Sequence, residues 1–300
     1  MSSVPALPQI ERSSAGPAGR GLSLTALWTL YAFSLRQHRH GKRWIVMAAL
    51  MLLPAGLALL VRNTAHNVPG VALEFVFGFM LIPQALLPLV ALIYASGMIQ
   101  DEQEDQTITY LLIRPIPKWA LYAMKLLATL TVAVVLTVVF TSLTYAAIYA
   151  GADRQPEHVL LRCLKASSIH ATAVVAYCCL FGLMSLMAKR ILIVGILYIA
   201  IFEGLFANLA FGVRLLTVIY YTRLIAYRTL PFIVSTPFGT QDFAAEAWQL
   251  DIRNDPKLLE HPQFGTCLIV LFVGSLVLTA LAAFLCSRRE FYVKTAEKGS

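Results

Sequence analysis

The chain has 300 residues, of which 58% are hydrophobic and only 13% are charged. Soluble domains carry about 25% charged residues. This composition, with a mean hydropathy of +0.71, therefore excludes a water-soluble globule and indicates a polytopic membrane protein. The net charge of +8 is modest for this length, and indicates cytoplasmic anchoring rather than nucleic-acid binding.

The N-terminal region divides into two parts. Residues 1–21 are rich in Ser, Pro, Gly and Ala and predict a disordered cytoplasmic tail. Apolar residues then recur at helical spacing before a basic cluster at 36–43: Leu24, Leu27, Trp28, Tyr31 and Leu35. This pattern predicts an amphipathic helix in the membrane interface, although a frayed extension of the first span fits the same residues.

Six apolar segments are long enough to cross the roughly 30 Å of bilayer hydrocarbon as helices. Pro83 and Pro88 are expected to kink the second of them. Together the segments predict an all-α polytopic protein with a single six-helix domain over residues 22–300. The predicted spans are 44–61, 75–99, 120–150, 166–188, 191–213 and 264–286.

The predicted loop 214–263 is not uniformly polar. Its first part, 215–230, carries aliphatic and tyrosine side chains among arginines. It predicts either an interfacial or re-entrant helix or a loop packed on its own protein. Residues 242–262 are acidic and polar and are expected to be exposed.

Six spans place both termini on the same side of the membrane. With the termini in the cytoplasm, fifteen Lys and Arg residues lie on inner segments and four on short outer loops. The basic residues of the long loop 214–263 have little weight in this comparison, because long loops translocate regardless of charge. The bias predicts N-in and C-in topology, with the stretch 101–125 in the cytoplasm and 214–263 outside.

The stretch 101–125, DEQEDQTITYLLIRPIPKWALYAMK, is a long charged interruption between two apolar segments. Four carboxylates precede the apolar run 108–113, for which Asp105 is the expected N-cap. Pro115 ends this short helix, and Pro117 suits the first position of the next one. The pattern predicts a short helix at the membrane surface that touches a soluble partner, and an ordinary charged loop is the alternative.

The same stretch resembles the first cytoplasmic loop of ABC-2 type transporter permeases. In that family a Glu-x-x-Gly-Thr element precedes a Leu-Leu pair, a Pro-x-x-Arg/Lys turn and a Gly-Lys pair. This chain departs from the pattern at Gln106 and Met124, where glycine is usual. The matching residues are Glu104, Thr107, Leu111, Leu112, Arg114, Pro115, Ile116, Pro117, Lys118 and Lys125.

The resemblance implies the membrane-spanning permease subunit of an ATP-driven transporter. It implies an N-terminal elbow helix, a coupling helix that docks on a separate ATP-binding subunit, and pairing with a second permease chain as a homodimer or heterodimer. The implied location is the cell membrane, a bacterial inner or plasma membrane. The implied coupling residues are Glu102, Glu104, Thr107, Ile108, Leu111, Leu112, Arg114, Pro115, Lys118 and Lys125.

Other chemistry has little support in the sequence. No Gly-x-x-x-x-Gly-Lys-Ser/Thr loop occurs, so ATP is expected on a partner chain, and no enzymatic activity or cofactor is expected here. The scattered histidines and five cysteines predict no metal site. An ATP-independent secondary transporter and a non-transporting membrane assembly subunit are the alternatives, although no internal repeat is visible.

Glu203 is the one carboxylate near the middle of a predicted span, and Asn208 follows it. A charge there costs at least about 2.5 kcal/mol on insertion scales, so it should face the protein interior or a wet cavity. Two interpretations fit equally: a pathway or dimer-interface residue, and a glutamate hydrogen-bonded locally near a distorted helix end.

Overall fold

The computed structural model describes residues 24–40, 43–65, 68–104, 117–150, 159–188, 190–208, 212–236, 239–248 and 261–288. At 39, 40, 43, 99–104, 235, 236 and 239–241 only the backbone is described. The main helices are α1 (Leu24–His40), α2 (Arg43–Thr64), α4 (Leu87–Glu104), α6 (Lys118–Tyr149), α7 (Val159–Met187), α8 (Ile191–Tyr198), α9 (Val218–Thr229) and α11 (Phe264–Arg288). The shorter elements are α3 (Gly70–Leu73), π-helices η1 (Glu74–Leu86) and η2 (Ile199–Leu205), 3-10 helices η3 (Phe206–Asn208) and η4 (Gly212–Leu216), α10 (Phe243–Ala247), and strands β1 (Ile233–Thr236) and β2 (Gly239–Asp242).

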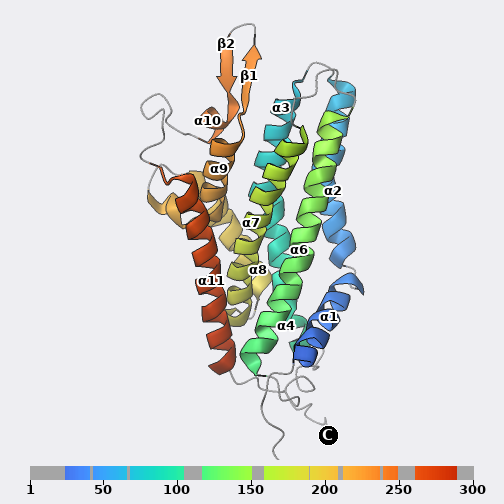
Figure 1. Cartoon of the computed structure of the whole chain (residues 1–300), viewed down its shortest axis with the longest axis vertical. Helices are drawn as coiled ribbons and strands as arrows, with labels where there is room; N and C mark the ends of the chain where they lie inside the picture. Colours follow the sequence, from blue (N-terminus) through green and yellow to red (C-terminus); the bar gives the residue numbers. More distant parts are fainter. Residues whose placement is uncertain are drawn as a thin grey trace, which may run out of the picture.

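Six helical segments of the described chain are long and apolar enough to cross a membrane, which confirms the predicted all-α polytopic fold. They form an elongated bundle with the β-hairpin at one end and α1 toward the other (Figure 1). We call these the hairpin end and the α1 end. The segments are Trp44–Thr64, Gly70–Met98, Lys118–Tyr149, Val159–Met187, Ile191–Asn208 and Phe264–Arg288.

α7 is the central helix, and it packs against α4, α6, α9 and α11. Close approach to α6 depends on Gly182, because a Cβ there would lie 2.8 Å from the Tyr122 hydroxyl oxygen. By contrast, α8 and α11 expose many Leu, Ile, Val and Phe side chains. Such outward apolar faces suit contact with lipid or with another membrane helix.

The ends of two spans differ from the sequence prediction. α7 begins at Val159, whereas the sequence predicted a polar loop up to Lys165 and a span from 166. The helix extends because the polar side chains Arg162 and Lys165 hydrogen-bond to other elements at the hairpin end. The described part of the fifth span ends at Asn208 rather than 213, in 3-10 geometry.

The second span consists of three helical segments, a π-helix between two α-helices. Pro83 lies inside the π-helix η1, and Pro88 is the second residue of α4. Proline lacks the N–H that continues a helical ladder, so a helix that contains one must depart from regular α-helical bonding nearby. A π-helical stretch covers Glu74–Leu86 and contains Pro83, whereas the predicted kink stays a prediction.

The region after the fifth span is more ordered than predicted. α9 buries Ile219, Tyr220 and Leu224 and packs on α7 and α11, as the alternative of packing on its own protein expected, but it is a helix rather than a loop. An interfacial or re-entrant position for it stays a prediction. The antiparallel hairpin β1–β2, which the sequence did not predict, pairs Ile233 with Asp242. The expectation of an exposed 242–262 segment is wrong for Trp248, which is buried because it packs against aromatic side chains.

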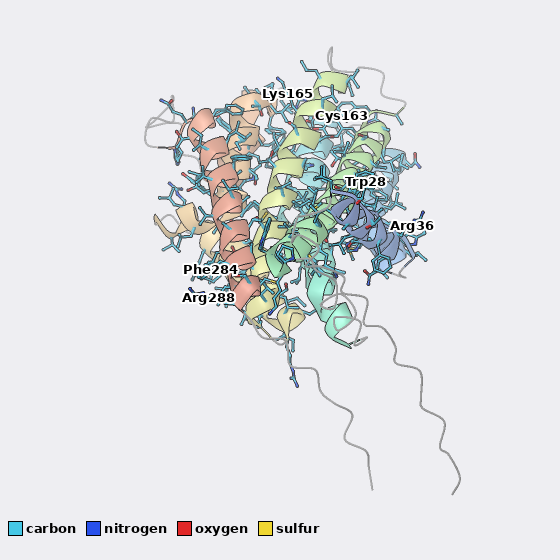
Figure 2. The ribbon with its side chains drawn as sticks, turned by 60° about the horizontal axis from the view of Figure 1, so that its bottom comes forward. Trp28, Arg36, Cys163, Lys165, Phe284 and Arg288 are labelled. Carbon is cyan, nitrogen blue, oxygen red and sulfur yellow. The ribbon has the colours of Figure 1, made fainter. Side chains whose placement is uncertain are left out.

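α1 lies at an angle to α2 and packs on α6 (Figure 1). The Tyr31 hydroxyl donates to Thr131 Oγ1 at 3.1 Å, and the His38 ring contacts Thr129 Oγ1 at 3.1 Å. Leu24 and Trp28 are exposed. Figure 2 shows Trp28 and Arg36 on α1, and Arg288 beside Phe284 near the end of α11. An interfacial position for α1 stays a prediction.

Candidate functional site

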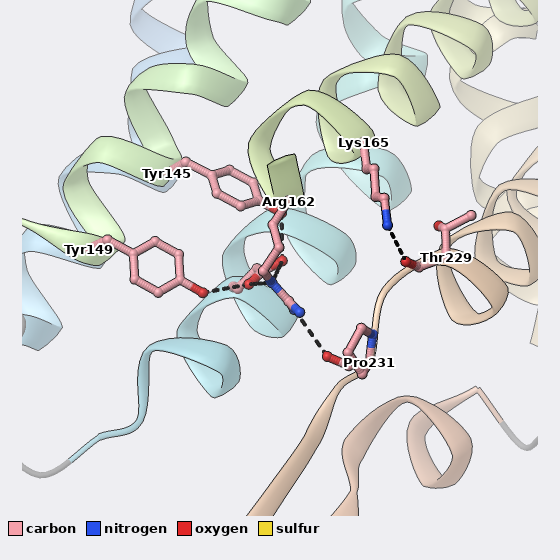
Figure 3. A network of polar contacts seen from close by, with 7 residues as sticks. Tyr145, Tyr149, Arg162, Lys165, Thr229 and Pro231 are labelled. Atoms are coloured by element: carbon pink, nitrogen blue, oxygen red, sulfur yellow. Dashed lines mark hydrogen bonds and ion pairs between the residues drawn. The ribbon is translucent and has the colours of Figure 1, made fainter. Parts of the chain in front are cut away.

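A buried carboxylate at the hairpin end joins three spans (Figure 3). Glu74, the first residue of η1, accepts hydrogen bonds from the Tyr145 and Tyr149 hydroxyls, both at 2.6 Å. Arg162 of α7 donates its Nε–H to both carboxylate oxygens, at 3.2 and 2.9 Å. We call these four residues the Glu74 network. The Arg162 guanidinium balances the charge of the carboxylate, and the two phenol groups donate hydrogen bonds to it.

Arg162 also contacts the segment that leads into the hairpin. Its Nη2 donates to the Pro231 carbonyl oxygen at 3.1 Å, and its guanidinium lies 5.9 Å from the centre of the Phe232 ring. Three residues along α7, Lys165 donates to the Thr229 carbonyl oxygen at 3.2 Å. One face of α7 therefore holds the connection between α9 and β1 (Figure 3).

Helical spacing explains why these groups meet. Tyr145 and Tyr149 are four residues apart on α6 and so share one face. Gly70 lets the start of the second span approach this face, because a Cβ there would lie 2.9 Å from Tyr149 Cε1. The side chain of Glu74 has no exposed surface and that of Arg162 is 12% exposed. The ion pair is therefore largely desolvated.

Glu203 occupies a second buried polar site, which is held differently. Its carboxylate accepts from the backbone N–H groups of Val218 and Ile219, at 3.1 and 3.0 Å, and from the Tyr198 hydroxyl at 3.2 Å. Val218 and Ile219 are the first residues of α9, whose N–H groups lack partners within the helix. Glu203 thus caps α9, which agrees with the interpretation of a locally hydrogen-bonded glutamate near a distorted helix end.

Asn208 supports the same junction. Its side chain donates to the Gly204 carbonyl oxygen at 2.6 Å and accepts from Arg223 Nη1 at 2.9 Å. Arg223 lies on α9 and is only 7% exposed. Burial lowers the pKa of its guanidinium from the ordinary value. The two intramembrane polar candidates therefore both join the end of the fifth span to α9.

The end of α4 and the start of α6, which flank the middle of the predicted coupling stretch in the sequence, lie at the α1 end (Figure 1). Glu102 and Glu104 belong to the last turn of α4, and only their backbone is described. Lys118 begins α6. The remaining residues of the prediction lie outside the described part of the chain: Thr107, Ile108, Leu111, Leu112, Arg114 and Pro115.

Lys125 is only 3% exposed and donates through Nζ to the Met98 carbonyl oxygen at 3.1 Å. This contact joins α4 and α6, the two helices that flank the 105–116 segment. Lys125 is therefore held between two helices and does not present its charge on a surface.

Sequence analysis missed the Glu74 network as a site. Glu74 and Arg162 are 88 residues apart, and neither belongs to a local motif. The available signal was an acidic residue at the start of one span together with the Tyr145 and Tyr149 pair at the end of the next. Among the residues that the structure describes, no group of three or more His, Cys, Asp or Glu side chains is placed to hold a metal ion.

In a comparison with known families, residues 35–220 match the model of the ABC-2 family transporter protein. The match covers more than half of the chain and includes Glu74, Arg162, Glu203 and the stretch 101–125. The curated proteins contain no sequence that matches the chain. The family match and the six apolar spans show that this chain belongs to the ABC-2 transporter family, whose members are multi-pass membrane proteins.

Proposed function

We propose that this chain couples the ATP cycle of a separate ATP-binding subunit to movement of a substrate across the cell membrane. The observation that carries the proposal is the family match, which includes the whole of 101–125. A permease of this family is a membrane transport component and not itself a catalyst. The absence of a phosphate-binding loop from the sequence supports ATP binding by the partner, with no cofactor on this chain.

The coupling stretch receives the movement in this mechanism. When the ATP-binding subunits close on ATP, they displace the 106–114 segment. α4 and α6 flank this segment and are joined by the bond from Lys125 to Met98, so both helices are displaced together. In this proposal Leu111, Leu112 and the nearby charged residues contact the partner. Lys125 lies inside the bundle, where it joins the two helices that move.

The proposed topology places the α1 end in the cytoplasm and the hairpin end outside. It rests on the excess of Lys and Arg in the predicted inner segments. One chain supplies six spans, so we propose that two permease chains pair to enclose the pathway. The exposed apolar faces of α8 and α11 are compatible with such pairing.

The test replaces the Leu pair of the coupling stretch. The double variant Leu111→Asp/Leu112→Asp is expressed with its ATP-binding subunit, and recovery of the complex and ATP hydrolysis are measured. Buried anchors at interfaces contribute about 2 kcal/mol or more each. We expect association to fall by more than about tenfold while membrane insertion is unchanged.

The matched control is Leu160→Asp/Leu161→Asp, which changes an adjacent and exposed Leu pair at the hairpin end. This control should associate and hydrolyse ATP like the parent. If the Leu111/Leu112 variant inserts normally and still binds and stimulates the ATP-binding subunit, the coupling assignment is wrong.

A further inference from the structure

The Glu74 network connects four parts of the chain at the hairpin end. Glu74 comes from the second span, Tyr145 and Tyr149 come from α6, and Arg162 comes from α7. Through Pro231, Arg162 adds the α9–β1 connection. No neighbouring pair of these elements can separate here without breaking a contact of this network or exposing it to water.

Aromatic packing follows the same lines as the polar contacts. The rings of Phe75 and Phe79 on η1 lie 5.4 and 5.1 Å from the Phe232 ring, between centroids. Trp248 also packs against Phe75, at 5.3 Å. The hairpin segment is thus fixed to η1 through Phe232 and to α7 through Arg162. A displacement of η1 relative to α7 changes both sets of contacts.

The two bonds of Arg162 differ in their surroundings. The bonds to Glu74 are partly buried and end on a carboxylate with no exposed surface, whereas the bond to the Pro231 carbonyl is exposed. A buried ion pair has two favourable conditions, either paired and dry or separated and hydrated. Intermediate separations leave both charges without compensation, so the contact favours two discrete arrangements rather than gradual loosening.

We propose that Arg162 is a positioning residue that keeps the hairpin end of the bundle closed. Opening of the pathway toward this end requires Arg162 to leave Pro231 and Glu74, so that η1 and the hairpin segment separate from α6 and α7. This inference rests on the proposed transport function for the step that drives opening. The closure itself depends only on contacts within this chain.

A native cysteine reports on this closure. Cys163 follows Arg162 on α7, is buried, and lies 3.7 Å from Ser142 of α6 between Sγ and Oγ. The residue is 9% exposed, so its reaction with a thiol reagent is slow in the closed arrangement and becomes faster when α6 and α7 separate. The labelling rate therefore measures the population of the open arrangement, provided that opening and closing are fast relative to labelling.

The experiment uses the full chain in lipid nanodiscs, with Cys163 kept and the other four cysteines replaced by alanine. We expect Arg162→Gln to raise the rate of maleimide labelling by about tenfold or more, because the closed arrangement loses its ion pair. Arg162→Lys, which retains a cation, should restore most of the slow labelling. Lys165→Met is the matched control: it removes the bond to Thr229 and leaves the Glu74 network intact, so its rate should stay within about twofold of the parent.

Equal labelling of the parent and Arg162→Gln overturns the inference, as does equal acceleration by Lys165→Met. A second arm adds the ATP-binding subunit with ATP and vanadate, which should accelerate labelling in the parent. If Arg162→Gln accelerates labelling but ATP and vanadate do not, the inference that Arg162 keeps this end closed is supported. The proposed coupling of this movement to ATP is then contradicted.

Discussion

Glu74 and Glu203 are both fully buried glutamates in helices that could cross a membrane, yet different groups stabilise their carboxylates. Glu74 is paired with a cation and two hydroxyl groups that come from two other helices. Glu203 accepts two backbone N–H groups at the start of α9 and the hydroxyl of Tyr198, five residues earlier. The contacts of Glu74 join spans that are distant in the sequence, whereas the contacts of Glu203 fix the junction between the fifth span and α9.

This difference shows that burial of a glutamate does not by itself indicate what the residue does, because the groups that bind its carboxylate decide that. Removing one partner of an ion pair leaves the other charge buried without compensation. Removing a carboxylate that caps backbone groups leaves neutral donors without partners, which has a smaller penalty. The following variants test that order, from the largest expected effect to the smallest.

Arg162→Met should have the largest effect on stability. It leaves Glu74 buried with only the two tyrosine hydroxyls, and breaking a buried pair typically costs about 3–5 kcal/mol. Thermal unfolding in detergent measures the loss, with Lys165→Met as the reference for losing a partly buried lysine. If both variants unfold at the same temperature, the Arg162–Glu74 ion pair contributes no more to stability than the contact made by Lys165.

Glu203→Ala should cost less, about 2–3 kcal/mol, because two backbone N–H groups at the start of α9 lose their acceptor. Glu203→Gln retains one acceptor oxygen and should lose only about 1 kcal/mol. The same unfolding measurement is used for both variants. A Glu203→Gln loss as large as that of Arg162→Met would contradict the distinction between capping and ion pairing.

Two tyrosine variants compare the hydroxyl contacts of the two sites. The Tyr149 hydroxyl lies 2.6 Å from Glu74, whereas the Tyr198 hydroxyl lies 3.2 Å from Glu203. Tyr149→Phe should cost about 1.5–3 kcal/mol, and Tyr198→Phe about 0.5–1 kcal/mol, because short bonds to charged groups are stronger. A reversed order in chemical denaturation would show that distance does not rank these bonds.

Tyr227 provides a tyrosine–carboxylate pair outside the spans, in which the phenol donates to Asp242 at 3.0 Å. Burial, followed by this bond and the nearby carboxylate charge, raises the pKa of Tyr227 to about 12. Because the folded pKa exceeds the unfolded value, the contribution to stability is complete below about pH 10 and is lost as the pH rises toward 12. The hairpin should loosen over this range in the parent but not in Tyr227→Phe, as hydrogen exchange of 233–242 would show.

Hydropathy was sufficient to predict six spans, and the motif residues in 101–125 were sufficient for the ABC-2 resemblance, because both signals lie within continuous stretches of the sequence. Sequence analysis also offered packing on the protein as an alternative for the α9 segment, whose aliphatic and tyrosine side chains suit burial, but it described that alternative as a loop. It placed the start of α7 too late, because Arg162 and Lys165 look like loop residues until their partners are known. The Glu74 network depends on side chains that meet only after the helices pack, so neither spacing nor composition predicts it.

α6 spans the whole distance between the two ends as a single α-helix of 32 residues. At about 1.5 Å per residue its length is about 48 Å, well beyond the roughly 30 Å of bilayer hydrocarbon. Lys125 lies near one end of this helix, and Tyr145 and Tyr149 lie near the other. The helix can therefore transmit a movement from one of its ends to the other. A small tilt imposed near Lys125 would move the Tyr145 and Tyr149 hydroxyl groups away from Glu74 at the far end, with no intervening relay of side chains.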